Sequence, residues 1–149
     1  MLMRRDRAML AVTIMLDVAF HAGREATVSA ADIAERIGQA RRGMEPLLQA
    51  LSRAGLLESV RGPHGGYRLG RPRREIRLSD IVAVAVAEDA TVSDGPGGRL
   101  QAVVIDRLWA ELDEAARALL AELTIEDLLR RAAAAGLRRA ASEPISFAI

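Results

Sequence analysis

A glycine- and proline-rich segment at residues 61–66 constrains the fold of this chain more than any other sequence feature. It reads RGPHGG, with three glycines and one proline in six residues. Proline has no amide hydrogen for a helical hydrogen bond and glycine weakens a helix, so we expect a tight turn here. Residues 56–60 before it and 67–69 after it have the composition of strands. The sequence therefore predicts a β-hairpin in this part of the chain.

The N-terminal stretch predicts a helix that packs on a core. Apolar residues recur at spacings of three and four over residues 9–20, so a first helix is expected over residues 5–22, ending at Gly23. Arginines ahead of this stretch also resemble a secretory signal, but Asp17 interrupts the apolar region. No segment reaches about 18 uninterrupted apolar residues, which argues against a membrane span. We expect a cytoplasmic protein.

A second, short helix and a tight turn are predicted next. The pattern Ser29-Ala-Ala-Asp32 is typical of a capping box, in which two side chains satisfy the free amides at a helix start. Gly38 is expected to end this helix after about two turns. A short helix followed by a short turn and another helix is the helix-turn-helix pattern.

The third helix would be the recognition helix of that pattern. We place it at residues 43–54, with Pro46 in its first turn, where the missing amide hydrogen breaks no hydrogen bond, and Gly55 at its end. Its amino end would then point into the major groove of DNA. The side chains expected to be buried are Leu47, Leu48, Leu51 and Ala54.

Charge is distributed unevenly along the chain. Residues 36–77 hold ten arginines and three acidic residues, a local charge of +7, whereas residues 78–149 hold seven arginines and twelve acidic residues, a charge of −5. The basic middle is either a solvated face or a surface for a polyanion. Because this basic stretch overlaps the predicted helix-turn-helix, the interpretation as a polyanion-binding surface is favoured.

A hairpin directly after a recognition helix is a wing. Gly65 and Gly66 allow its backbone to approach a phosphate closely, while Arg61 or His64 reaches the minor groove. Only 3% of the residues are aromatic, so aliphatic side chains must build the core, which favours helices. The predicted fold class is mainly α: a winged helix-turn-helix with a small two-stranded wing, plus a long C-terminal dimerisation helix.

The C-terminal half predicts three more helices. One covers residues 78–87, whose apolar run should be buried, and a final one begins at the capping pattern Thr124-Ile-Glu-Asp127. Between them a long helix over residues 99–122 carries a heptad seam, which predicts either a dimer interface or packing on its own domain. Trp109 would anchor that interface or lie in the core. The seam residues are Ile105, Leu108, Leu112, Ala115 and Leu119.

The sequence contains no cysteine, and this excludes several classes of site. Disulfides, zinc-thiolate sites, cysteine nucleophiles and iron–sulfur clusters held by cysteines all need thiols. We also find no nucleophile-base pair, no phosphate-cradling Walker pattern and no metal-ligand spacing. An enzyme is therefore not expected.

The chain resembles the IscR family of bacterial winged-helix transcription regulators, which includes the NsrR and CymR types. The resemblance rests on AVTIMLDVA at residues 11–19, ADIAER at residues 31–36 and, most strongly, AGLLESVRGPHGGYRLG at residues 54–70. It implies a homodimer that binds a partly palindromic operator in double-stranded DNA, usually as a repressor. Carried over by position, Glu45 matches the base-reading glutamate of the family and Arg61 its wing arginine.

These considerations give a set of candidate DNA-binding residues. Glu45 would accept a hydrogen bond from cytosine N4, or alternatively complement the helix dipole. Ser29 would donate to a phosphate, or simply cap its own helix. The full set is Ser29, Arg41, Arg42, Glu45, Arg53, Arg61, Gly62, His64, Gly65, Gly66 and Tyr67.

The sequence departs from the cluster-binding members of the family. These members carry three cysteines in the loop before the dimer helix, and residues 89–99 here hold none. We therefore expect no cofactor and no metal site. Asp106 stands near the position of a non-cysteine ligand in some relatives, although an aspartate there is more often solvated.

The predicted organisation has three parts. Residues 1–87 form the DNA-binding region, residues 88–104 a flexible loop, and residues 105–149 the dimerisation helix and the C-terminal helix and tail. A small-molecule effector, if there is one, would bind between the fourth helix, this loop and the long helix. The alternative function is a winged-helix module for protein–protein interaction that has lost specific DNA binding.

Overall fold

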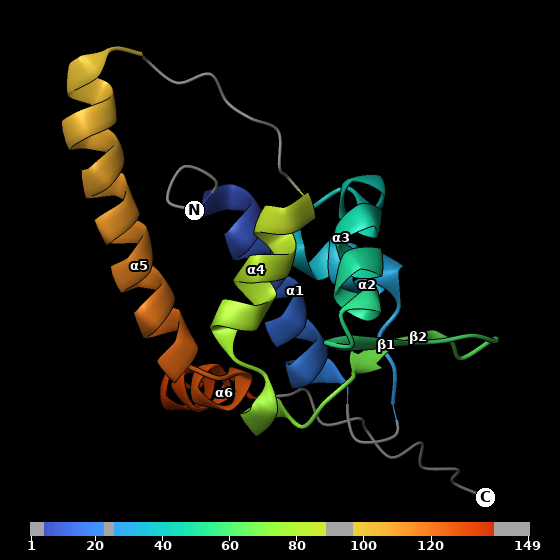
Figure 1. Ribbon diagram of the computed structural model, residues 1–149. Coiled ribbons are helices and arrows are strands. Elements are labelled where there is room, and N and C mark those ends of the chain that lie inside the picture. Colours follow the sequence, from blue (N-terminus) through green and yellow to red (C-terminus); the bar gives the residue numbers. More distant parts are fainter. Residues whose placement is uncertain (1–4, 23–25, 89–96, 139–149) are drawn as a thin grey trace, which may run out of the picture.

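The computed structural model describes residues 5–22, 26–88 and 97–138, and it has the predicted mainly helical, winged architecture (Figure 1). The N-terminal helix α1 (Arg5–His21) lies between the other helices, and the wing projects on the side of the molecule opposite the long helix α5. The elements that follow α1 are α2 (Ala30–Ile37), α3 (Arg41–Arg53), β1 (Leu57–Val60), β2 (Gly66–Leu69), the 3-10 turn η2 (Arg73–Glu75), α4 (Leu78–Glu88), the π-helical segment η3 (Gln101–Ile105), α5 (Asp106–Glu122) and α6 (Ile125–Ala134).

Helix α2 begins and ends where the sequence predicts. The Ser29 hydroxyl oxygen accepts a hydrogen bond from the Asp32 amide at 3.1 Å, which satisfies a free donor of the first turn. Gly38 ends the helix with φ of 72°, in the left-handed region that glycine enters without steric cost. A bidentate ion pair then fixes α2 to α1, because Arg36 donates to both carboxylate oxygens of Asp17 at 2.8 and 2.9 Å.

Helix α3 differs from its prediction at both ends. It starts at Arg41 rather than residue 43, so Pro46 lies beyond the first turn, and the Arg42 carbonyl receives no amide hydrogen from it. Arg42 and Pro46 are both exposed, so a water molecule can donate a hydrogen bond to the Arg42 carbonyl instead. Ala54 is exposed at the end of the helix instead of buried. The predicted burial of the leucines is confirmed, and Met44 and Ala50 join Leu47, Leu48 and Leu51 in the interior.

The two wing strands pair antiparallel, with Leu57 opposite Leu69 and Val60 opposite Gly66. A tight turn joins them, in which the Gly65 amide donates to the Gly62 carbonyl at 2.9 Å. The predicted hairpin is therefore confirmed.

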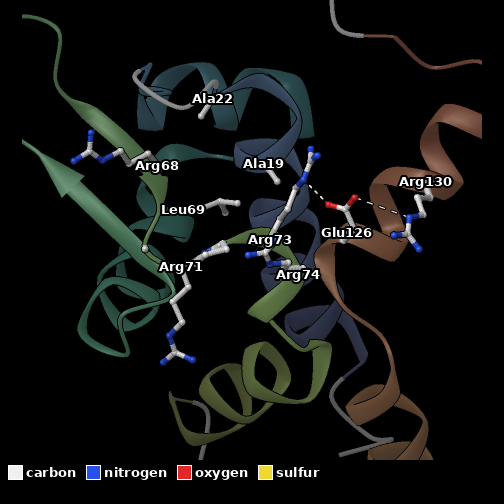
Figure 2. Close-up of a pocket in the computed structure, with 11 residues that line it drawn as sticks. Ala19, Ala22, Arg68, Leu69, Arg71, Arg73, Arg74, Glu126 and Arg130 are labelled. Carbon is white, nitrogen blue, oxygen red and sulfur yellow. Dashed lines mark ion pairs between the residues drawn. The ribbon is translucent and has the colours of Figure 1, made fainter.

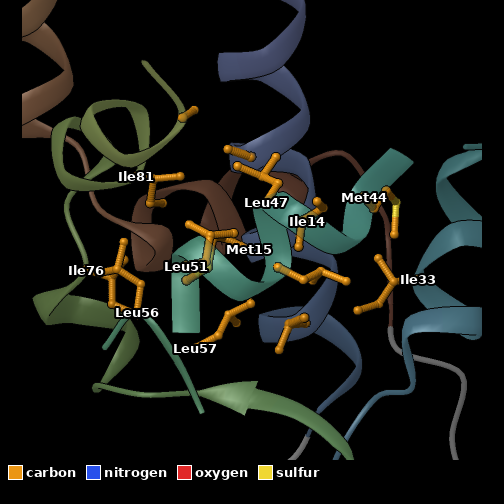
Figure 3. Close-up of a cluster of buried hydrophobic side chains, with 14 of the residues drawn as sticks. Ile14, Met15, Ile33, Met44, Leu47, Leu51, Leu56, Leu57, Ile76 and Ile81 are labelled. Atoms are coloured by element: carbon orange, nitrogen blue, oxygen red, sulfur yellow. The ribbon is translucent and has the colours of Figure 1, made fainter. Parts of the chain in front are cut away.

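Aliphatic side chains form the core, as the low aromatic content predicts. Figure 3 shows Ile14 and Met15 of α1 packed against Leu47 and Leu51 of α3, with Ile81 of α4 on one flank. All five side chains are fully buried. The core therefore joins the helix-turn-helix elements to α1 and α4.

Helix α4 buries only part of its apolar run. Ile81, Val82 and Ala85 face the interior, whereas Ala83 and Ala87 are exposed. The expectation that the whole run is buried was wrong, because a helix at the margin of the core has one covered face.

The chain is helical again from residue 99, within the segment predicted as a loop over residues 88–104. Residues 99–104 continue into α5 through the π-helical segment η3, and residues 89–96 of that segment lie outside the described part of the chain. The rest of the predicted division into three parts stays a prediction. None of the described helices is long and apolar enough to cross a membrane.

Helix α6 is fastened to the start of α4. The predicted capping box is present, since the Thr124 hydroxyl accepts from the Asp127 amide and the Asp127 carboxylate accepts from the Thr124 amide. Backbone hydrogen bonds from Leu78 to the Leu123 carbonyl, at 2.9 Å, and from Ile125 to the Ile76 carbonyl, at 3.0 Å, then join the two segments.

Replacing Gly66 with alanine should destabilise the protein. An added Cβ would lie 2.5 Å from the Val28 carbonyl oxygen and 2.7 Å from its carbon, and both are backbone atoms. We expect Gly66→Ala to lower the free energy of unfolding by about 1–3 kcal/mol. Gly43→Ala is the control, because no atom lies within 4 Å of a Cβ there and alanine favours a helix by about 0.5–1 kcal/mol. Urea unfolding followed by circular dichroism measures both, and equal midpoints would contradict the prediction.

Candidate nucleic-acid interface

A groove of about 460 Å³ lies between the start of α2, the first turns of α3 and the wing. Eight of the eleven predicted DNA-binding residues line it, and they come from three separate elements. The eight are Ser29, Arg41, Glu45, Arg61, Gly62, Gly65, Gly66 and Tyr67.

Backbone pairing holds the wing against the start of α2. The Val28 amide donates to the Tyr67 carbonyl at 2.9 Å, and the Tyr67 amide donates to the Val28 carbonyl at 2.8 Å. The Thr27 hydroxyl also donates to the His64 carbonyl at 2.7 Å, which ties down the turn of the wing. Because Ser29 follows Val28 directly, these bonds fix the position of the α2 N-terminus relative to the wing.

One row of side chains on α3 faces the groove. Arg41, Glu45 and Gln49 are spaced four residues apart, so they lie above one another on the same helix face. The Arg41 Nε atom lies 3.5 Å from the Glu45 Oε1 atom, and both side chains are about half exposed or more. An exposed pair of this kind contributes about 0–1 kcal/mol, so either residue can exchange its partner for a DNA group at little cost.

The start of α2 adds donors to the groove. Ser29 already caps the Asp32 amide, and the remaining first-turn amides have no partner within the helix, which makes a helix N-terminus suited to a phosphate. The Ser29 oxygen already caps the helix as an acceptor, and its hydroxyl hydrogen remains available to donate. The two predicted roles of Ser29 are therefore compatible.

Three predicted residues lie outside the groove lining. Arg42 and Arg53 are exposed on α3, and His64 is exposed in the turn of the wing. Sequence reasoning also missed Ala30, Gln49 and Val60, which do line the groove. The four-residue spacing from Arg41 through Glu45 could have identified Gln49.

The two histidines and Asp106, the candidate non-cysteine ligand, lie on different elements. His21 lies at the end of α1, with its Nε2 atom 3.7 Å from the Asp17 carboxylate, while His64 is in the wing turn. The Asp106 carboxylate accepts a hydrogen bond from the side-chain Nε2 atom of Gln101 at 3.0 Å. Across the described ranges no three histidine, cysteine, aspartate or glutamate residues gather as a metal site. With no cysteine in the sequence, the donors present do not fit a thiolate-held iron–sulfur cluster.

The predicted dimer seam forms an exposed apolar face on α5 and the end of η3. Ile105, Leu108, Trp109 and Leu112 are 39–43% exposed and Leu119 is 59% exposed. Ala115 is exposed as well. Trp109 is therefore not a core residue of the single chain. Contiguous apolar surface of this kind is typical of an interaction site.

Comparisons with known proteins place these features in a context. A family model named Rrf2, described as an iron-dependent transcriptional regulator, matches residues 5–131. The HTH-type transcriptional regulator IscR of Xenorhabdus nematophila is 39% identical over 123 residues, covering 80% of this chain and 74% of that protein. IscR of Aliivibrio salmonicida is 40% identical over 122 residues, covering 80% and 72%.

Two solved structures share the fold. The structure of T. potens IscR matches with a TM-score of 0.70 and 32% identity over 91% of each chain. The structure of CymR, described as the global cysteine regulator of B. subtilis, matches with a TM-score of 0.64 and 29% identity over 83% of this chain and 92% of that one. These similar proteins are transcription regulators rather than enzymes.

Proposed function

Because the chain belongs to the Rrf2 family of transcriptional regulators, we propose that it acts as a homodimer on a partly palindromic operator and represses transcription. DNA-binding transcription regulation is common to the family members it resembles and is the function of this chain. The operator, the dimer, the repression and the absence of a cysteine-held cluster are the proposed parts.

The groove between α2, α3 and the wing is the observation that carries the proposal. It gathers eight candidate residues, from elements separated along the sequence, on one surface. Arginine suits phosphates and guanine edges, and glutamate can accept a hydrogen bond from cytosine N4. Arg41, Glu45 and Arg61 therefore combine the two kinds of contact that sequence-specific binding needs.

Each element would make a different contact with the duplex. The amino end of α3 would enter the major groove, where Glu45 reads one base pair. The wing would lie along the minor groove and present Arg61, while the start of α2 contacts the phosphate backbone. Phosphate contacts would supply most of the affinity, and a few base contacts would supply the specificity.

Dimerisation through α5 would explain its exposed apolar face. Seam residues alternate at spacings of three and four, which is the pattern of paired helices. A twofold axis along this face would present two recognition helices to half-sites about 34 Å apart, or one turn further.

Two variants test the assigned DNA contacts. We expect Arg61→Ala to weaken binding to the DNA upstream of the protein's own gene by about tenfold. The slope of log affinity against log salt concentration should become shallower by about one. Glu45→Ala should chiefly relax the preference at one base pair. Mobility shifts and fluorescence anisotropy on operator variants measure both effects.

Arg107→Ala is the matched control, because it removes one exposed guanidinium from α5, outside the groove. Equal affinities of all three variants and the parent across the operator set would refute the assigned roles. If the parent itself binds this DNA no better than random duplex, the protein-interaction module becomes the better explanation. Repression is tested by transcription in vitro from the same promoter, where added protein should lower the transcript.

A charge within the seam should separate the subunits. Leu112→Glu places a carboxylate in the middle of the apolar face. Ala118→Glu is the control, because it places a carboxylate on the same helix about 120° around the axis from Leu112. Sedimentation should give twice the 16.0 kDa chain mass for the parent and Ala118→Glu, and the single mass for Leu112→Glu. A parent that sediments as a monomer would contradict the dimer.

DNA binding should not depend on iron. The family model is described as iron-dependent, yet the donors of this chain do not fit a cysteine-held cluster. We expect colourless protein after purification, no visible absorbance after incubation with iron and sulfide, and unchanged operator affinity after treatment with a chelator. A brown protein whose binding fails after chelation would overturn this part of the proposal.

A further inference from the structure

A second and larger hollow, of about 860 Å³, lies away from the predicted DNA groove. The end of α1, strand β2, the turn after it and helix α6 form its walls (Figure 2). We call it the arginine pocket after five of its lining residues, Arg68, Arg71, Arg73, Arg74 and Arg130, to which Glu126 adds a single carboxylate. It shares no lining residue with the groove.

Glu126 acts as the internal counter-ion of this pocket. Its carboxylate pairs with Arg73 on one side and lies 3.9 Å from the Arg130 Nε atom on the other, and Figure 2 shows both arginines directed toward it. Its side chain is only 23% exposed, while those of Arg73 and Arg130 are 57% and 73% exposed. Arg130 also lies 3.7 Å from the Asp127 carboxylate, so two carboxylates of α6 pair with two guanidinium groups that remain open to solvent.

The remaining arginines keep most of their donors free of carboxylates. Arg68 pairs with Glu58 at 2.9 Å on the wing and, like Arg71, extends away from Glu126 (Figure 2). Arg71 donates to the Ala54 carbonyl at 3.3 Å. The Arg74 side chain makes neither a hydrogen bond nor an ion pair with any described residue. A guanidinium has five N–H donors, so the pocket holds more donors than the protein satisfies.

The surplus of guanidinium donors determines the class of ligand. Paired N–H groups of arginine match the oxygens of phosphate and carboxylate, and several arginines together favour an anion with more than one charge. A hollow of this size is in the range of small-molecule sites, about 300–1,000 Å³. We propose that the arginine pocket binds a small soluble molecule that carries a phosphate or diphosphate group.

The location of the pocket gives such a ligand contacts with both halves of the chain. Residues 68–74 belong to the wing and the turn after it, whereas Glu126 and Arg130 belong to α6, which follows the long helix. The ion pair between Arg73 and Glu126 spans this boundary. A phosphate bound to Arg73 and Arg74 would compete with Glu126 for Arg73.

Calorimetric titration of the full chain with sodium pyrophosphate, at low salt and without DNA, tests the site. We expect saturable binding of one pyrophosphate per chain. Arg74→Gln should weaken it by about tenfold, because it removes a charged donor that has no partner among the described residues to leave unsatisfied. Glu126→Gln should tighten it several-fold, because the competing carboxylate is neutralised.

Two residues of α5 supply controls with the same change of charge. Arg107 and Glu111 pair with each other on an exposed helix face, so Arg107→Gln and Glu111→Gln should leave the affinity unchanged. Thermal unfolding checks that Glu126→Gln, which loses two ion pairs, remains folded. If Glu126→Gln is unfolded, the test rests on whether Arg74→Gln weakens pyrophosphate binding more than Arg107→Gln does.

Several results would overturn the proposal. They are the absence of saturable binding, an equal loss with Arg107→Gln, and a loss with Arg61→Gln instead of Arg74→Gln, which would move the anion to the DNA groove. If Arg74→Gln weakens duplex binding as much as Arg61→Ala does, the phosphate belongs to the DNA backbone rather than to a soluble ligand. Because the titration contains no DNA, its outcome is separate from that of the operator experiments.

Discussion

The close backbone contact between Val28 and Tyr67 is the constraint on which the predicted DNA surface depends. Two hydrogen bonds join the segment before α2 to strand β2, at 2.9 and 2.8 Å. They are possible only because Gly66, beside Tyr67, has no Cβ to meet the Val28 carbonyl. The contact brings the α2 N-terminus, the first turns of α3 and the wing around one groove, which no single element could form.

A second backbone contact relates this surface to the C-terminal helices. The strand-like pairing around Arg77 and Thr124 joins the start of α4 to the start of α6. The Arg77 side chain also donates to the Ala121 carbonyl at the end of α5, at 2.6 Å. The long helix is thus held at its C-terminal end, while its seam remains exposed. The winged half and the proposed dimer half therefore meet at a defined junction, and the arginine pocket lies beside it.

Features that depend on neighbouring residues could be predicted from the sequence. The N-cap at Ser29, the capping box at Thr124 and the turn at residues 61–66 depend on residues within three or four positions of each other. The start of α3 could not be placed in the same way. Pro46 is tolerated inside a helix when its surroundings are exposed, and exposure depends on how the helix packs. The π-helical segment η3 had no sequence signal that we could identify.

The sequence by itself determined the order of the elements, the wing turn, the apolar seam and the lack of thiolate ligands, because each depends on local backbone preference or on the presence of a residue type. Only the tertiary structure decided that Ser29, Arg41 and Arg61 line one groove, and that Glu126 of α6 lies between Arg73 and Arg130. Residues more than fifty positions apart meet at such sites because core packing and backbone pairing fix the helices in space, and hydrophobic periodicity does not specify that arrangement.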